Sequence, residues 1–146
     1  MEKVLTLNDI KKVATDILKV AQKKIKKNAS VVAFYGDLGV GKTTITKELA
    51  NDLGVEDNVV SPTFVIMKIY KTKNKIFKNL IHIDAYRLKN GQELNHLGFK
   101  EILKNKENLV IIEWPNNVED CLPTDTIKII LEHKNETTRS IKFCYN

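Results

Sequence analysis

Arginine is nearly missing from this 146-residue chain, because Arg87 and Arg139 are the only arginines among 24 basic residues. Enzymes that pass a phosphoryl group to a small molecule commonly clamp it with several arginines, since a planar guanidinium donates paired hydrogen bonds to phosphate. The composition therefore disfavours a small-metabolite kinase. The other 22 basic residues are lysines spread along the chain, and the net charge is +6. Solvated lysines are the simplest interpretation, and a basic face that contacts RNA is the alternative.

Cysteine is scarce, and long hydrophobic runs are absent. Cys121 and Cys144 lie far apart and form no C-x-x-C pair, which is typical of free thiols in a reducing cytosol. His82, His96 and His133 show no metal-ligand spacing with them. No apolar run approaches the roughly 18 residues of a transmembrane helix, and the start does not resemble a signal peptide. We expect a cytoplasmic protein without a membrane anchor.

One complete phosphate-binding loop, G-x-x-x-x-G-K-T, stands out against these absences. Its residues are Gly36, Asp37, Leu38, Gly39, Val40, Gly41, Lys42 and Thr43, followed by Thr44. Glycines let the backbone curl into a nest of N–H groups around phosphates. In such a loop the lysine contacts the β- and γ-phosphates, and the threonine hydroxyl ligates Mg²⁺.

The segments on both sides of the loop support this interpretation. Val31–Tyr35 is a short apolar run typical of a buried strand, and Thr43–Leu53 carries apolar residues at helical spacing. A helix that begins at the loop adds the positive end of its dipole to an anion site. The order strand, loop and helix therefore predicts nucleotide binding.

A phosphate loop needs an acid that helps to hold Mg²⁺, usually at the end of a neighbouring buried strand. Glu113 follows the apolar residues 109–112 and fits this pattern best, and Asp84 ends a second apolar segment, residues 80–83. We predict a magnesium shell of Thr43, Glu113 and Asp84. Which carboxylate contacts the metal directly stays open.

Two sequence elements of guanine-specific switch proteins are missing. No Asn-Lys-x-Asp occurs, since Asn74-Lys75-Ile76-Phe77 and Asn105-Lys106-Glu107-Asn108 lack the aspartate in the last place. No Asp-x-x-Gly follows the phosphate loop. We therefore expect a preference for ATP and ADP over GTP.

The apolar patterning predicts one α/β domain over residues 1–146, a P-loop NTPase-like fold. Its mixed sheet should have parallel strands at the nucleotide and antiparallel hairpins outside them, flanked by helices. The expected elements are an edge strand at Lys3–Thr6, a helix capped by Asn8 or Asp9 and reaching Ile25, extended runs at Ser61–Tyr70 and Ile76–Asp84, a loop with one short helix at Gly91–Lys104, a buried strand at Leu109–Trp114, and a hairpin of Thr126–Glu132 with Ser140–Tyr145.

Five blocks of sequence together resemble the TsaE family, the bacterial ATPases of tRNA threonylcarbamoyladenosine biosynthesis. The resemblance runs from about Leu7 to Phe143. The blocks, in chain order, are Gly36–Thr44, Ser61-Pro62-Thr63-Phe64, His82-Ile83-Asp84-Ala85-Tyr86-Arg87-Leu88, Leu97-Gly98-Phe99 and Glu113-Trp114. Many families share the first block, whereas the conjunction of all five is much more specific.

The resemblance implies an ATP- and Mg²⁺-binding protein with weak ATPase activity alone. It would act with the partner proteins TsaB and TsaD, which place a threonylcarbamoyl group on adenosine 37 of tRNA, and would meet tRNA only through them. ATP hydrolysis would reset the complex between turnovers, without any transfer of the group by this chain. The competing functions are a small-metabolite kinase and an RNA-binding module with a vestigial nucleotide site.

The resemblance also implies roles for individual residues. Lys42 and Thr43 would hold phosphate and Mg²⁺, Glu113 and Asp84 would hold the metal, and Thr63 would sense the γ-phosphate. Three further residues would line the same face: His82, Tyr86 and Arg87. Simpler interpretations are a strand start for Thr63, a surface ion pair for Arg87, a buried core histidine for His82, and core or rim aromatics for Tyr86 and Trp114.

Overall fold

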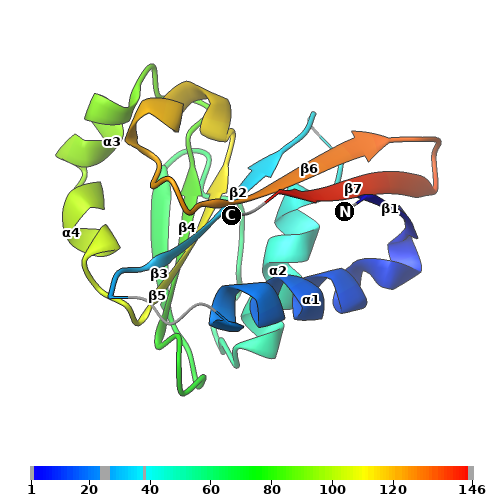
Figure 1. Ribbon diagram of the computed structural model, residues 1–146, viewed down its shortest axis with the longest axis horizontal. Coiled ribbons are helices and arrows are strands. Elements are labelled where there is room, and N and C mark those ends of the chain that lie inside the picture. Colours follow the sequence, from blue (N-terminus) through cyan, green and yellow to red (C-terminus); the bar gives the residue numbers. More distant parts are fainter. Residues whose placement is uncertain (1, 24–26, 38, 145–146) are drawn as a thin grey trace.

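The computed structural model describes residues 2–23, 27–37 and 39–144 of the chain. In this part the strands form one seven-stranded mixed sheet in the order β1-β7-β6-β2-β5-β4-β3, and helices flank it (Figure 1). The expected α/β class is confirmed. The elements are β1 Glu2–Thr6, the 3₁₀ turn η1 Leu7–Asp9, α1 Ile10–Lys23, β2 Ser30–Tyr35, α2 Lys42–Asp52, β3 Met67–Lys71, β4 Asn79–Asp84, α3 Gly91–His96, α4 Phe99–Leu103, β5 Asn108–Glu113, the 3₁₀ segment η2 Pro115–Cys121, β6 Ile127–His133 and β7 Thr138–Cys144.

The centre of the sheet is parallel and its margins are antiparallel, as predicted. Strand β2 pairs in parallel with β5 and β6, and β5 pairs in parallel with β4. The outer pairs β3–β4, β6–β7 and β1–β7 are antiparallel. Because parallel strands point the same way, the carboxyl ends of β2, β4 and β5 meet at one edge. That edge carries the phosphate loop.

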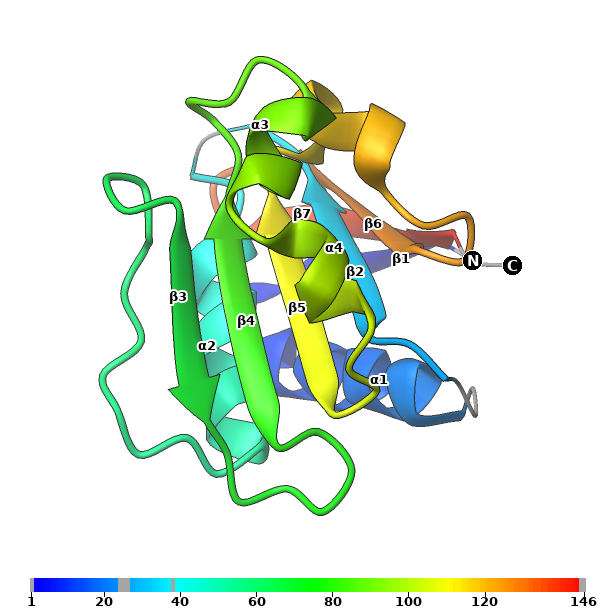
Figure 2. The ribbon, with the colours of Figure 1, turned by 90° about the vertical axis from the view of Figure 1, so that its left-hand side faces the viewer.

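Each face of the sheet is covered by its own group of helices. Leu109 and Ile111 of β5 belong to the core beneath α1 and α2, whereas Val110 and Ile112 belong to the core beneath α3, α4 and η2. Figure 2 shows α3 and α4 on one side of β4 and β5, with α2 on the other. Burial on both faces explains why β5 is a continuous apolar run rather than an alternating one.

The start of α1 differs from the expected cap. Neither Asn8 nor Asp9 caps α1 directly, because the turn η1 precedes it. Asp9 instead reaches back, and its Oδ2 accepts from the backbone N–H of Thr6 at 2.8 Å and from the Thr6 hydroxyl at 3.1 Å. The helix is described as far as Lys23, so the predicted end at Ile25 lies outside the described residues.

The expected extended run Ser61–Tyr70 is correct only from Met67 onward. Residues 61–66 form a turn in which the N–H groups of Val65 and Ile66 both donate to the carbonyl of Pro62, at 3.1 and 2.6 Å. Ile66 has a φ of 69°, a left-handed conformation that a β-branched residue rarely adopts. The turn brings Ser61 and Thr63 towards the phosphate loop.

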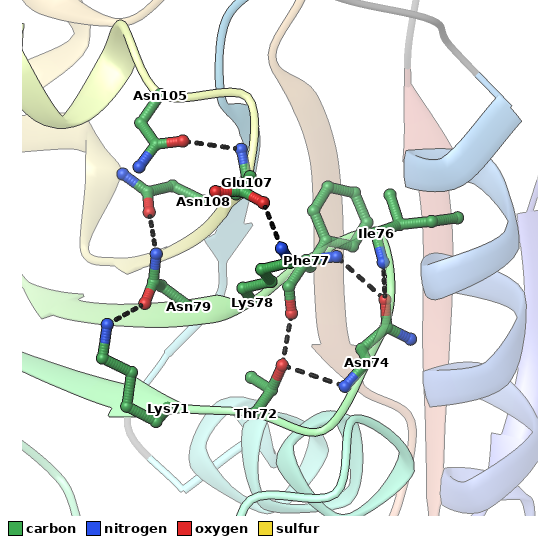
Figure 3. A network of polar contacts seen from close by, with 10 residues as sticks. All are labelled: Lys71, Thr72, Asn74, Ile76, Phe77, Lys78, Asn79, Asn105, Glu107 and Asn108. Atoms are coloured by element: carbon green, nitrogen blue, oxygen red, sulfur yellow. Dashed lines mark hydrogen bonds and ion pairs between the residues drawn. The ribbon is translucent and has the colours of Figure 1, made fainter.

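The second extended run also starts later than expected, at Asn79. Figure 3 shows the reason: the Asn74 side chain accepts hydrogen bonds from the backbone N–H groups of Ile76 and Phe77, both at 2.8 Å. This local turn replaces strand pairing over residues 74–78. Asn79 then links β4 to β5 by donating to Asn108 at 2.9 Å.

Two short helices, α3 and α4, replace the single one expected within Gly91–Lys104. Asn90 caps α3 by accepting from the Glu93 N–H at 3.1 Å. Gly98 (φ 91°) then separates α3 from α4. The other expected elements are confirmed, with bounds shifted by at most two residues, and the predicted strand end at Tyr145 lies outside the described residues. Among the described residues no helix is both long and apolar enough to cross a bilayer.

Candidate nucleotide-binding site

A cavity of about 450 Å³ opens at the carboxyl ends of β2, β4 and β5, above the first turn of α2. It brings together parts of the phosphate loop, both predicted carboxylates and the turn before β3. The residues that line it are Gly39, Gly41, Lys42, Thr43, Thr44, Ser61, Thr63, Asp84, Tyr86, Glu113 and Trp114. Four segments far apart in the sequence therefore contribute to one site.

The loop has a shape that only glycines permit at two positions. A Cβ on Gly36 would lie 2.7 Å from the carbonyl oxygen of Leu131 and 2.8 Å from a methyl of Val40. Gly41 has a φ of 113° and immediately precedes α2. The chain thus turns tightly from β2 into an 11-residue helix whose free N–H groups point to the cavity.

Lys42 is buried, with only 4% of its surface exposed. Its Nζ donates to the carbonyl of Gly36 at 2.6 Å and lies 3.7 Å from the ring centroid of Trp114. Burial lowers the pKa of Lys42, while the nearby charges of Glu113, Asp84 and Asp37 act in the opposite direction. An anionic ligand in the cavity would favour the charged ammonium further.

The two predicted carboxylates lie side by side, since Asp84 of β4 and Glu113 of β5 are register partners. Both are buried. The Thr43 hydroxyl donates to Glu113, 3.1 Å from Oε1 and 3.2 Å from Oε2. The Thr63 hydroxyl donates to Asp84 Oδ2 at 2.9 Å, and the Tyr86 N–H donates to Asp84 Oδ1 at 3.0 Å.

These oxygen atoms suit Mg²⁺ in the presence of phosphates. Magnesium is usually held by one or two carboxylates together with water and substrate phosphates, rather than by an all-protein cage. Thr43, Glu113 and Asp84 supply hydroxyl and carboxylate oxygens at one place. The described residues contain no group of three or more His, Cys, Asp or Glu side chains that could hold a metal by themselves. The donor set therefore fits a metal that arrives with a nucleotide.

Tyr86 and Trp114 form the rim of the cavity, with ring centroids 5.2 Å apart. Trp114 adopts a left-handed conformation (φ 57°) directly after Glu113, which redirects the chain from β5 into η2. Of the two simpler interpretations, core or rim, the rim holds for Tyr86, which is 60% exposed.

Neither Arg87 nor His82 is among the residues that line the cavity. The guanidinium carbon of Arg87 lies 4.8 Å from the centroid of the Phe64 ring, and both side chains are exposed. His82 is fully buried in the core next to Glu113, and its Nε2 lies 2.5 Å from Glu113 Oε2. His82 is thus a buried core histidine that contacts the site through the Glu113 carboxylate.

The remaining described residues of the loop do not line this cavity. Gly36, Asp37 and Val40 line a second cavity of about 400 Å³ together with residues 130–133 of β6. Leu38 falls outside the described residues.

Two polar residues near the site were not predicted. Ser61 lines the cavity, 2.8 Å from the Thr63 hydroxyl. Asn117 of η2 donates to the carbonyls of Ala85 and Tyr86, at 3.0 and 3.2 Å, and so fixes the turn that follows Asp84. The Ser-Pro-Thr-Phe block pointed to Ser61, but no local pattern marks Asn117.

Comparison with known proteins gives consistent matches over most of the chain. The family model described as Threonylcarbamoyl adenosine biosynthesis protein TsaE matches residues 6–141. The tRNA threonylcarbamoyladenosine biosynthesis protein TsaE of Rickettsia typhi is 36% identical over 140 residues, which cover 94% of this chain and 92% of that protein. The protein of the same name from Bacillus subtilis is 36% identical over 117 residues, or 80% of this chain and 70% of that one.

A solved structure agrees with these matches. The crystal structure of Bacillus subtilis YdiB superposes with a TM-score of 0.71 at 29% identity, covering 99% of this chain and 87% of that one. The resemblance noted from the sequence blocks is confirmed. The chain belongs to the TsaE family of tRNA threonylcarbamoyladenosine biosynthesis proteins, P-loop NTPase-like proteins with a mixed α/β sheet.

Proposed function

We propose that residues 1–146 act as one ATPase domain that binds and hydrolyses Mg·ATP in support of threonylcarbamoyladenosine formation at tRNA adenosine 37. The observation that supports this best is the convergence of Lys42, Thr43, Asp84 and Glu113 on one cavity at the start of α2. A buried cation, a hydroxyl and two carboxylates are the groups that phosphoryl chemistry with Mg²⁺ requires.

The two cavities suggest how the nucleotide lies across the loop. The γ-phosphate and the metal belong beside Glu113 and Asp84, where the oxygen ligands are. The nucleoside would then extend along the loop into the second cavity, lined by Gly36, Asp37 and residues 130–133. We propose adenine as the base, because the guanine-recognition sequence is missing from the chain.

Nucleotide binding would exchange contacts that already exist in the site. Lys42 would leave the Gly36 carbonyl and the Trp114 ring for the β- and γ-phosphates, and the Thr43 hydroxyl would turn from Glu113 to the metal. When bound, Mg²⁺ would neutralise charge on the phosphates. Glu113 and Asp84 would hold the metal or its waters, and Thr63 would lie beside the γ-phosphate.

Partner proteins would complete this site. Phe64 is 82% exposed, and Val65, Tyr86 and Arg87 are exposed beside it, next to the rim of the cavity. Exposed apolar side chains grouped in this way are typical of a protein interface. We propose that TsaB and TsaD cover this face and speed up a hydrolysis that is slow in the isolated chain. On this model TsaB and TsaD contact tRNA, and this chain transfers no threonylcarbamoyl group.

Steady-state phosphate release, with and without the TsaB–TsaD complex, tests the proposal. We expect at least about tenfold faster release with the partners, a stabilisation of the transition state by about 1.4 kcal/mol. An isolated chain that already turns over at about 10 s⁻¹, the median for enzymes, and ignores the partners would contradict it. Transfer of labelled phosphate to a small acceptor would instead favour a kinase, and salt-dependent tRNA binding without ATP would favour an RNA-binding module.

A further inference from the structure

His82 is an unusual side chain for its place in the sheet. It lies on β4 between Leu80 and Asp84 on the face covered by α2, and none of its surface is exposed. Its register partner on β5 is Ile111, an apolar core residue. Its Nδ1 is buried and has no hydrogen-bond partner among the described residues. An apolar side chain of similar size would avoid the cost of burying that ring nitrogen. Packing alone therefore does not account for a histidine here.

The second ring nitrogen makes one short contact, to the carboxylate of Glu113. The distance from His82 Nε2 to Glu113 Oε2 is 2.5 Å. We assign the proton to Nε2, since a carboxylate oxygen accepts. Glu113 Oε1 then has the Thr43 hydroxyl, at 3.1 Å, as its described partner. Oε1 is thus the oxygen that becomes available when that hydroxyl turns towards a metal.

We propose that His82 is a positioning residue for Glu113: from deeper in the core, on the same face of the sheet, it holds Oε2 so that Oε1 faces the metal position. The inference rests on the proposed function, because it assigns Glu113 to Mg²⁺. Partners that orient a metal-ligating carboxylate typically contribute about 10- to 100-fold in metal affinity. Without the imidazole the Glu113 side chain would keep Thr43 alone as its described side-chain partner, and could rotate with it.

Two polar substitutions separate positioning from mere occupancy of the core. The amide nitrogen of His82→Gln reaches about as far as Nε2 and can still donate to Glu113, whereas the amide of His82→Asn is one methylene too short. The readout is ATP-induced stabilisation, measured by thermal melting during a Mg²⁺ titration and again in EDTA. The Mg²⁺ concentration for half the effect should rise at least about 10-fold in His82→Asn and less than about 3-fold in His82→Gln. ATP binding in EDTA should not change.

Two further variants keep the test decisive. His82→Leu removes the orphaned nitrogen, so its melting temperature should stay within about 4 °C of wild type, while the Mg²⁺ concentration for half the effect should rise at least about 10-fold, as in His82→Asn. His96→Gln, on the exposed surface of α3, is the matched control and should behave as wild type. A destabilised His82→Leu with an unchanged Mg²⁺ requirement is the pattern of a purely structural histidine and overturns the proposal. Equal Mg²⁺ requirements for His82→Gln and His82→Asn overturn it as well. If Mg²⁺ has no effect on ATP binding by the wild-type protein, then both this proposal and the proposed function are wrong.

Discussion

The two halves of the candidate site are built very differently. The first half consists of the phosphate loop, the start of α2 and Glu113, and it packs closely on the sheet: Lys42 and Glu113 are each 4% exposed, and Gly36 lies against Leu131 of β6. The second half consists of the turn 61–66 and the segment 84–88, which lie almost entirely outside helices and strands and carry exposed side chains such as Phe64 and Arg87.

The contacts that hold each half differ in the same way. Glu113 lies in a strand paired on both sides, by β2 and β4. The turn 61–66 is held to Asp84 by the Thr63 hydroxyl and by the hydrogen bond from the Asp84 N–H to the Ile66 carbonyl, at 2.8 Å. Ile66 stores strain at its positive φ, a cost of about 1–3 kcal/mol. We infer that the first half determines nucleotide affinity and that the second half responds to nucleotide and partners.

The largest expected effect is on hydrolysis, from Glu113→Gln in the first half. The amide keeps the shape and can still accept from His82, but it lacks the charge that holds the metal. Phosphate release in the presence of TsaB and TsaD should fall about 100-fold, the loss typical of one preorganised electrostatic group. Asp84→Asn, at the junction of the halves, tests the assignment further. If both variants keep the full rate and the full ATP-induced rise in melting temperature, the metal shell is wrong.

The next effect is on affinity, from Lys42→Ala. Removing a charge-assisted contact to two phosphates should weaken ATP binding at least about tenfold, or 1.4 kcal/mol, with the fold retained. Calorimetry measures the affinity directly. The control is Lys47→Ala, on the exposed side of the same helix, which should bind ATP as wild type does. Equal affinities for Lys42→Ala and wild type would remove the phosphate-loop assignment.

The difference between the halves also explains what the sequence predicted well. The loop, Glu113 and Asp84 follow local rules, namely a fixed spacing of glycines and an acid after an apolar strand, so their positions were predictable. The turn 61–66 was not, because Pro62 and the apolar residues after it also suit a strand. The turn depends on the Pro62 carbonyl and on the distant Asp84.

Contacts between distant segments account for the remaining misses. Asn117 lies 32 residues from Ala85 in sequence, and only the path of η2 brings them together. The motif resemblance grouped His82 and Arg87 with the cavity because they flank Asp84 in sequence. His82 shares a face of β4 with Asp84 but lies two residues further into the core, and Arg87 comes after the end of the strand, so sequence proximity did not give their positions.

A smaller effect should come from the second half, with Phe64→Ser and Arg87→Ala. Both side chains lie outside the cavity and stack on each other, so the variants should lower the partner-stimulated rate more than ATP affinity. We expect the stimulation to drop roughly fivefold, about 1 kcal/mol, as for an ordinary interface contact. The exposed Lys89→Ala is the control. If these variants lost as much ATP affinity as partner-stimulated rate, the second half would contribute to nucleotide binding as well, and the proposed difference between the halves would be wrong.

The smallest expected effect is on the stability of the nucleotide-free protein, from Lys42→Met. Because burial lowers the pKa of Lys42, its charge opposes folding wherever the unfolded lysine is protonated. Methionine fills a similar volume without that charge. The variant should therefore melt at or above the wild-type temperature at neutral pH, within about 3 °C. The destabilisation of the wild type by this charge disappears as the pH rises from the lowered folded pKa towards the unfolded value of about 10.4, so the difference in melting temperature should shrink as the pH rises.

With Mg·ATP present, the wild type should melt at the higher temperature of the two, because the ligand stabilises only a site that can bind it. A variant that melts well below wild type without nucleotide would mean that the Gly36 and Trp114 contacts of Lys42 outweigh its burial, and that even the phosphate loop depends on its cation for stability.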